Sequence, residues 1–290
     1  MSLNSLIANY MCNKSDKARD AGLTPPESIS IIRDIRYASV STCQVLDLYR
    51  PKSFTGKLPV IVSVHGGGWV YGTKEVYQFY CMDLATRGFA VVNFTYRLAP
   101  KYKHPCAIED TNSVFEWVLA HADEYDMDAD NIFAVGDSSG AQCLALYASI
   151  ATDKSYAAKY PFKAPDKLKI KALGLNCGLY NAEVTRSVKQ LADYLPRRNG
   201  ADILHDITVI NNINPDFPPS FVMTSNGDFF REEPIALTRQ FDKYNIPYCC
   251  KEYGDEENKL MHVFHCDVKS SSAKEANDDE IAFFRRYYTT

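Results

Sequence analysis

Short apolar runs alternate with longer segments of helical periodicity along most of the chain. The runs are rich in β-branched and aromatic residues, which favour strands. The segment 108–121 instead places its apolar residues near helical spacing, and the segments 139–151 and 234–244 do the same. This alternation predicts an α/β protein with a mostly parallel sheet and helices on both faces. The predicted strands cover residues 44–49, 59–64, 90–95, 131–135, 169–175, 220–224 and 248–253.

Two segments do not fit the sheet pattern. Residues 1–42 and about 180–215 have no clear strand periodicity and are expected to be helical or irregular. We therefore predict one large domain at 43–290 with a cap insertion at about 180–215. The N-terminal segment 1–42 is expected to be part of the same small helical cap.

Composition and charge narrow the range of partners. The chain has 290 residues, 46% of them hydrophobic, and a net charge of −4. A core of ordinary size can form, and no dense basic run suggests nucleic acid or a membrane surface as a partner. No segment approaches eighteen apolar residues, and the first residues lack the pattern of an export signal. A small molecule is the expected partner, without membrane or nucleic acid.

The nine cysteines are odd in number and scattered, and they form no CxxC pair. A disulfide framework or a zinc site is therefore a poor fit, and reduced thiols in a cytoplasmic protein are expected. No phosphate-binding loop or metal-ligand spacing was found, so neither a cofactor nor a metal is expected.

The sequence GDSSG at 136–140 follows an apolar run. It fits G-x-S-x-G, in which a strand turns so sharply into a helix that the central serine is exposed above the sheet. Ser138 is the serine in question, and glycines at 136 and 140 leave room for the close approach of strand and helix. The motif alone is weak, because a Gly-Ser loop can arise by chance.

A second motif, HGGGW, follows the apolar run LPVIVSV and is more specific. A glycine-rich turn can aim consecutive backbone N–H groups at an oxygen that gains negative charge, as acyl transfer requires. We assign Gly67, Gly68 and the N–H group of Ser139 as oxyanion donors. His65 is expected to brace this loop, and Trp69 is a candidate substrate-binding residue because it adjoins the loop.

A serine nucleophile needs a histidine base and an acid, which in this fold follow it in the order acid, then histidine. Asp228 directly follows a predicted strand, where active-site groups gather. His262 lies beyond the last predicted strand and is the expected base. His265 is a rival because it lies only three residues further on, whereas His205 lies in the predicted cap.

Together these motifs resemble the hormone-sensitive-lipase-like branch of the α/β-hydrolases. The resemblance covers about residues 44–290 and rests on HGGGW, YRLAP at 96–100, GDSSG, NGDFFREE at 226–233 and MHVF around the histidine. It implies an eight-stranded, mostly parallel sheet, a small helical cap, and ester hydrolysis by a triad of Ser138, Asp228 and His262. The N-terminal 40 residues and the cap match no pattern of that family.

The leading hypothesis is a serine carboxylesterase for short acyl chains, acting through an acyl-enzyme. A carbohydrate acetyl esterase or an arylformamidase-like amide hydrolase would use the same site. A non-catalytic binding relative is a further alternative, although such relatives lack the histidine that this chain has. The oligomeric state is open, with a homodimer as one option.

Overall fold

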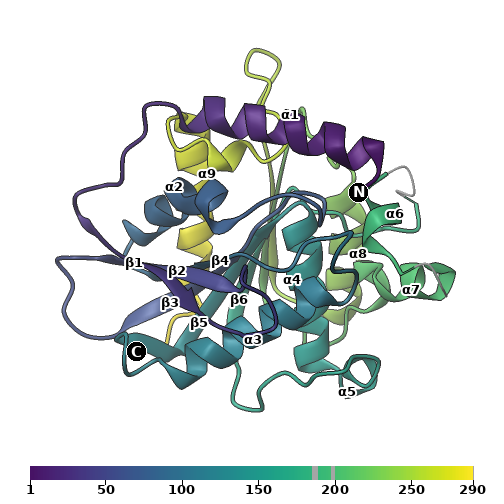
Figure 1. The fold of residues 1–290 in the computed structure, drawn as a ribbon, viewed down its shortest axis with the longest axis horizontal. Coiled ribbons are helices and arrows are strands. Elements are labelled where there is room, and N and C mark those ends of the chain that lie inside the picture. Colours follow the sequence, from purple (N-terminus) through teal and green to yellow (C-terminus); the bar gives the residue numbers. More distant parts are fainter. Residues whose placement is uncertain (185–188, 197–199, 290) are drawn as a thin grey trace.

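A central sheet organises the molecule (Figure 1). The structure is a computed structural model that describes residues 1–184, 189–196 and 200–289. These residues form an eight-stranded sheet in the order β1-β2-β4-β3-β5-β6-β7-β8. Strands β1 and β2 run antiparallel to their neighbours, and the other pairings are parallel. The strands are β1 (Ile29–Arg36), β2 (Val45–Pro51), β3 (Leu58–Val64), β4 (Ala90–Phe94), β5 (Met127–Asp137), β6 (Ile170–Asn176), β7 (Ser220–Ser225) and β8 (Tyr248–Tyr253).

Helices cover both faces of the sheet, as predicted. Helices α3, α4 and α8 pack into one apolar cluster, and α2 and α9 pack into the cluster on the opposite face. Every residue of β3 and β4 is buried between these layers, which explains their nearly continuous apolar sequences. The helices are α1 (Leu3–Asp20), α2 (Lys74–Ala85), α3 (Cys106–Ala120), α4 (Ser139–Thr152), α5 (Lys154–Ala157), α6 (Leu191–Tyr194), α7 (Gly200–Asp206), α8 (Glu233–Tyr244) and α9 (Ser271–Arg285), with short 3-10 turns η1 (Val209–Asn211) and η2 (Phe264–Cys266).

One secondary-structure prediction was wrong. Residues 1–42 were expected to be helical or irregular, but β1 lies within them and pairs with β2 at the edge of the sheet. The strand was missed because a bulge interrupts its pairing between Ile32 and Ile35, within a strand that has only one fully buried residue. Asp34 in this bulge has φ 58°. A bulge shifts the alternation by one residue and hides the period-two pattern of a strand.

The rest of the predicted cap lies near the carboxyl ends of the parallel strands. Helix α1 crosses the molecule beside these ends (Figure 1). The predicted insertion at 180–215 contains α6, α7 and η1, while residues 185–188 and 197–199 lie outside the described residues. In the described part of the chain, no helix is long and apolar enough to cross a membrane.

Candidate active site

Ser138 lies in a sharp turn between β5 and α4. Asp137 ends the strand, Ser139 begins the helix, and Ser138 itself has φ 52° and ψ −119°. A positive φ is unfavourable for a residue with a side chain, and such strain is concentrated at functional sites. This is the strand-to-helix turn that GDSSG predicts.

Two glycines allow this turn to pack closely. A Cβ atom on Gly140 would lie 2.1 Å from the carbonyl oxygen of Val64, and one on Gly136 would lie 2.8 Å from the carbonyl carbon of Gly140. Neither contact is sterically possible without a shift of the backbone. The start of α4 therefore sits directly against the end of β3, and both positions require glycine.

The glycine-rich loop after β3 lies beside the serine. Gly67 and Gly68 have φ 119° and 59°, and a Cβ atom on Gly67 would lie 2.2 Å from the carbonyl oxygen of Tyr71. Both glycines and Ser139 line the same pocket as Ser138. Within the described residues, the N–H groups of Gly67, Gly68 and Ser139 donate no hydrogen bond to another protein group. They are therefore available to an oxygen atom of a ligand.

Asp137 supports the glycine loop from inside the protein. Its carboxylate accepts hydrogen bonds from the Gly66 N–H group, at 3.1 Å, and from the Tyr77 hydroxyl, at 2.7 Å. A Cβ atom on Gly66 would lie 2.4 Å from this carboxylate, so only glycine fits there. Burial raises the pKa of Asp137 to about 6, although the Tyr77 hydrogen bond acts in the opposite direction. The motifs gave no indication of Tyr77, which comes from α2.

His65 braces the same loop, as the sequence suggested. Its ring stacks on Tyr96 with centroids 4.0 Å apart, and its Nδ1 atom lies 2.8 Å from the carbonyl oxygen of Gly66. The Tyr96 hydroxyl donates to the carbonyl oxygen of His65 at 3.0 Å. Burial lowers the pKa of His65 to about 4, so the imidazole is neutral at physiological pH. A fully buried ring in this position holds the loop and has no access to a substrate.

Asp228 and His262 form a close pair in the loops that follow β7 and β8. His262 Nδ1 lies 2.7 Å from Asp228 Oδ1, which also accepts a hydrogen bond from the Phe230 N–H group at 2.8 Å. Thr224 Oγ1 donates to Asp228 Oδ2 at 3.1 Å. Burial acts to raise the pKa of Asp228, but the hydrogen bond and charge of His262 outweigh it and hold that pKa below its usual value. The carboxylate is therefore ionised and fixes the orientation of the imidazole.

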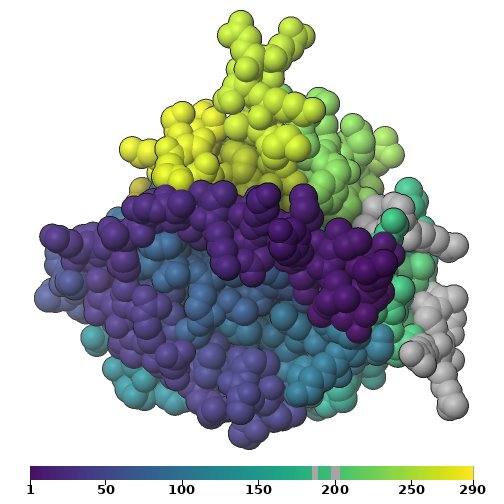
Figure 2. Space-filling model, turned by 45° about the horizontal axis from the view of Figure 1, so that its top comes forward, coloured from purple at the N-terminus to yellow at the C-terminus, as the bar shows by residue number. Residues whose placement is uncertain are grey.

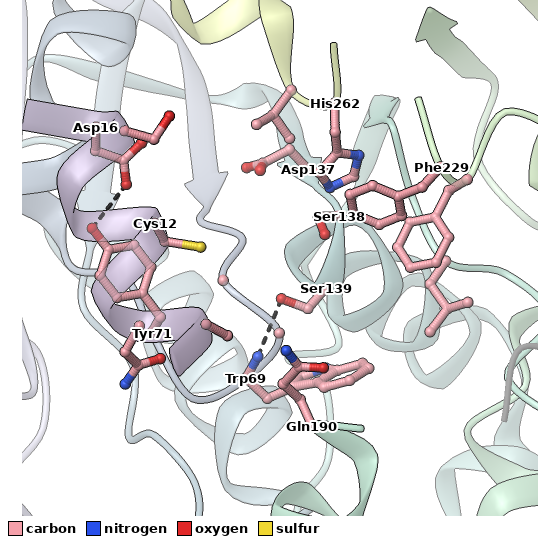
Figure 3. A pocket seen from close by; sticks show the side chains of 18 of the residues that line it. Cys12, Asp16, Trp69, Tyr71, Asp137, Ser138, Ser139, Gln190, Phe229 and His262 are labelled. Carbon is pink, nitrogen blue, oxygen red and sulfur yellow. Dashed lines mark hydrogen bonds between the residues drawn. The ribbon is translucent and has the colours of Figure 1, made fainter. Parts of the chain in front are cut away.

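The imidazole of His262 faces the serine. Figure 3 shows a ring nitrogen of His262 pointing toward the Ser138 side chain, and both residues line one pocket. The other ring nitrogen is the one bonded to Asp228. Serine, histidine and aspartate thus follow one another in space in the order that general-base activation of a hydroxyl requires.

The two other downstream histidines lie elsewhere. His265 is fully buried against Tyr80, with ring centroids 5.2 Å apart, and burial lowers its pKa to about 3. It does not line the pocket. His205 is largely exposed and pairs with Glu183 at 2.8 Å. Of these three histidines, only His262 lies beside Ser138.

The pocket in front of the serine has a volume of about 580 Å³. Trp69 lines it, but the indole ring is buried, stacks on Tyr194 with centroids 4.6 Å apart, and donates to Gln142 Oε1 at 3.1 Å. Trp69 is thus a fixed part of the pocket wall. Apolar side chains from the loops after β6, β7 and β8 also line the pocket: Leu179, Phe229, Phe230 and Val263.

The sequence analysis assigned residues 1–42 to the cap but did not identify which residues of α1 line this pocket. Figure 3 shows the Cys12 thiol pointing from α1 into the pocket, with Asp16 accepting a hydrogen bond from Tyr71 at 2.8 Å. The signal in the sequence is faint, because the lining residues are small or polar and resemble an ordinary surface face. They are Ala8, Asn9, Cys12, Ser15 and Asp16.

One group in the described residues has the composition of a metal site. Ligand atoms of Cys177, Asp228 and His262 lie within 4.8 Å of one another. Asp228 and His262 are already joined by their own hydrogen bond, which a metal ion would have to displace. The arrangement therefore fits proton transfer better than metal coordination.

Comparison with known proteins agrees with this architecture. The BD-FAE family model matches residues 46–230, which is more than half of the chain. Esterase LipC from Mycobacterium tuberculosis is 28% identical over 210 residues, which cover 68% of this chain and 51% of that protein. Carboxylesterase NlhH from the same species is 34% identical over 135 residues, or 45% of this chain and 42% of that protein. The chain spans about half the length of these relatives.

A solved structure extends the likeness to nearly the whole chain. Inhibited esterase B from Lactobacillus rhamnosis superposes with a TM-score of 0.89 at 23% identity, covering 98% of this chain and 95% of that one. At this identity the likeness establishes the fold, and it confirms the α/β-hydrolase architecture expected from the motifs. With the match over residues 46–230, the chain belongs to the BD-FAE family and has the fold of the α/β-hydrolase esterases.

Proposed function

We propose that this protein is a serine carboxylesterase in which Ser138 is the nucleophile, His262 the general base and Asp228 the acid that orients it. The observation that carries the proposal is the 2.7 Å contact between His262 and Asp228, made by an imidazole that faces a strained serine. The names of LipC and NlhH, an esterase and a carboxylesterase, support the same chemistry.

The first half of the reaction forms an acyl-enzyme. The Oγ atom of Ser138 attacks the ester carbonyl carbon while His262 takes the hydroxyl proton, and Asp228 stabilises the resulting imidazolium. The carbonyl oxygen becomes negative and accepts hydrogen bonds from the N–H groups of Gly67, Gly68 and Ser139. The N-terminus of α4 adds its positive dipole end at the same place. His262 then gives its proton to the leaving alcohol.

The second half releases the acid. Water enters, His262 accepts one of its protons, and the resulting hydroxide attacks the acyl carbon attached to Ser138. The same N–H groups stabilise the second tetrahedral intermediate. His262 returns the proton to the serine oxygen, and the carboxylic acid leaves.

The pocket supports a short acyl chain as the preferred substrate. Its volume of about 580 Å³ must hold both the acyl and the alcohol group, and Trp69 in its wall contacts the bound ester in this proposal. The polar side chains of Asn9, Ser15 and Asp16 on the α1 side favour an alcohol with hydroxyl groups. A carbohydrate acetyl ester is therefore the second candidate substrate.

The surroundings of the site extend the proposal. Helix α1 and the segment at about 180–215 act as the cap, since α1 and Gln190 both line the pocket. All nine cysteines are free, which supports a cytoplasmic location. The partner of the site is a small-molecule ester, and the reaction needs no nucleic acid. A homodimer stays a prediction.

A substrate panel tests this function. The wild type and Ser138→Ala are compared on p-nitrophenyl esters from acetate to laurate and on an acetylated xylo-oligosaccharide. We expect wild-type hydrolysis of the shorter esters and a loss of several orders of magnitude in kcat in the variant. A variant that keeps more than a few percent of the activity would exclude Ser138 as the nucleophile.

A further inference from the structure

Helix α1 has its polar side toward the protein and its apolar side toward solvent, which is the reverse of an ordinary surface helix. Its inward side is polar or small: Ser5 is fully buried, Asn9 donates to the carbonyl oxygen of Val70 at 3.1 Å, and Asp16 accepts from Tyr71. A surface helix normally buries its apolar face and exposes its polar one. Hydrogen bonds, rather than apolar contacts, hold α1 on the protein.

The outward side of α1 is apolar. Five large side chains, here called the α1 stripe, are each more than half exposed: Leu3, Leu6, Ile7, Tyr10 and Met11. Their spacing of three and four residues places them on one face of the helix. Figure 2 shows α1 as a ridge exposed along its length, so the stripe faces away from the body of the molecule.

Such a stripe is unusual on a free surface. Exposed hydrophobic residues scattered singly are normal, whereas a contiguous patch marks a binding surface. Phe229 lines the opposite side of the pocket and is also mostly exposed. Apolar side chains are thus exposed on both sides of the pocket.

Basic residues continue the same face. Lys14 and Lys17 follow Tyr10 at helical spacing, and both are exposed. Among the described residues, neither forms an ion pair, whereas the acidic side chains of Asp16 and Asp20 are bonded to Arg19. The outward face of α1 therefore carries apolar side chains and positive charge, while the acidic groups of the helix are already paired with Arg19.

We propose that this face of α1 docks on an anionic lipid surface, with the helix lying in the plane of the interface. Apolar side chains beside lysines are the pattern by which helices bind anionic lipid headgroups. A second copy of the chain fits less well, because pairing α1 with itself offers Lys14 and Lys17 no free carboxylate. This inference departs from the sequence-based expectation of no membrane partner, which considered basic runs and spanning segments only.

Docking would bring the pocket to the lipid. The inner side of α1 lines the pocket, and its outer side would lie among the headgroups. Only this one helix would then separate the pocket from the lipid. Apolar esters partition into lipid, and the enzyme would meet them where they are concentrated. The docking itself goes beyond the proposed function, because it requires no catalysis.

Vesicle co-sedimentation tests the proposal. The Ser138→Ala protein, which cannot hydrolyse ester lipids under the proposed function, is mixed with vesicles of phosphatidylcholine containing phosphatidylglycerol, or of phosphatidylcholine alone. We expect stronger binding to the anionic vesicles. Adding Leu6→Ser and Ile7→Ser should weaken binding at least tenfold, and Lys14→Gln and Lys17→Gln should weaken it about fivefold each.

A matched control removes exposed apolar residues outside α1. Val40 and Phe54 are exposed in loops, and Val40→Ser with Phe54→Ser should leave vesicle binding unchanged. Circular dichroism checks that every variant is folded. The proposal is overturned if the parent protein does not bind anionic vesicles, or if the control variant loses as much binding as the stripe variant. If light scattering shows that the parent protein is a dimer, that the stripe variant is a monomer, and that neither binds vesicles, the stripe mediates self-association and the proposal is wrong.

Discussion

Two helices border the same pocket and are held in opposite ways. In α4, twelve of the fourteen residues are buried, whereas in α1 only Ser5 is. Apolar burial and close glycine contacts therefore fix α4 and Ser138, while surface hydrogen bonds hold α1, each contributing about 1 kcal/mol. The difference indicates that substitutions around Ser138 and α4 are poorly tolerated, whereas substitutions in the part of the pocket wall formed by α1 are tolerated better.

The largest expected effect separates the two histidines near the site. His262→Ala should lower kcat by about 10⁴-fold or more, because it removes the proposed base. His265→Ala should cost about 2 kcal/mol of stability through the cavity it leaves, while the folded protein keeps its activity. Ester hydrolysis and thermal unfolding of both variants check this. The reverse pattern would transfer the role of base to His265.

A pair of glycines tests how tightly each helix is fixed. Gly140→Ala should lower kcat at least about 10²-fold, because the new Cβ atom would push α4 and Ser138 away from β3. Gly22, beyond the end of α1, has φ 80° and open space around it. Gly22→Ala should therefore cost only about 1 kcal/mol, from backbone strain alone. Similar activity losses in both variants would contradict the contrast between the helices.

The core beneath the site should respond to pH. Glu280 is fully buried, bonded to Asn176 Nδ2 at 3.0 Å, and burial raises its pKa to about 7. Because folding raises the pKa of Glu280, this residue contributes fully to stability below the pKa it has in the unfolded chain. The contribution is lost as the pH rises through about 7.

The Glu280→Gln variant checks this dependence. At pH 8.5 it should be more stable than the wild type, by at most about 3 kcal/mol, because the amide carries no charge to bury. The advantage should shrink toward pH 5. Urea unfolding at both values measures it, and an advantage independent of pH would rule out titration of Glu280.

The smallest expected effect concerns the α1 wall. Cys12→Phe should fill part of the pocket and lower kcat/KM for a hexanoate ester about tenfold relative to the acetate. Met11→Phe, on the outward side, is the matched control and should leave this ratio unchanged. If Cys12→Phe abolished hydrolysis of both esters equally, α1 would be part of the fixed machinery.

The same contrast explains what the sequence could predict. The motifs at 65–69 and 136–140 identified residues whose chemistry and backbone geometry are local, so Ser138 and the glycines could be placed without a structure. His262 followed from chain order, since a loop after the last strand reaches the site in this fold. Seven of the strands could be recognised because each is a short run rich in β-branched or aromatic residues, and in the strands buried on both faces this run is almost continuously apolar.

What the sequence could not predict depends on which face of an element turns inward. Nothing local in α1 indicates that Asn9 and Cys12 face the pocket while Leu6 and Ile7 face solvent, because this orientation is opposite to the usual one. Tyr77 was missed for another reason. Its contact with Asp137 joins residues 60 positions apart, and an ordinary helix position carries no signal for it.

The most direct test of the central claim is the site of covalent labelling by a p-nitrophenyl alkylphosphonate. Such a reagent is attacked by an activated serine and leaves a stable phosphonyl group on its oxygen. Mass spectrometry of the digested wild type should find this group on Ser138 alone, and His262→Ala should label far more slowly. Labelling of another residue, or equally fast labelling without His262, would contradict the proposed nucleophile and its activation.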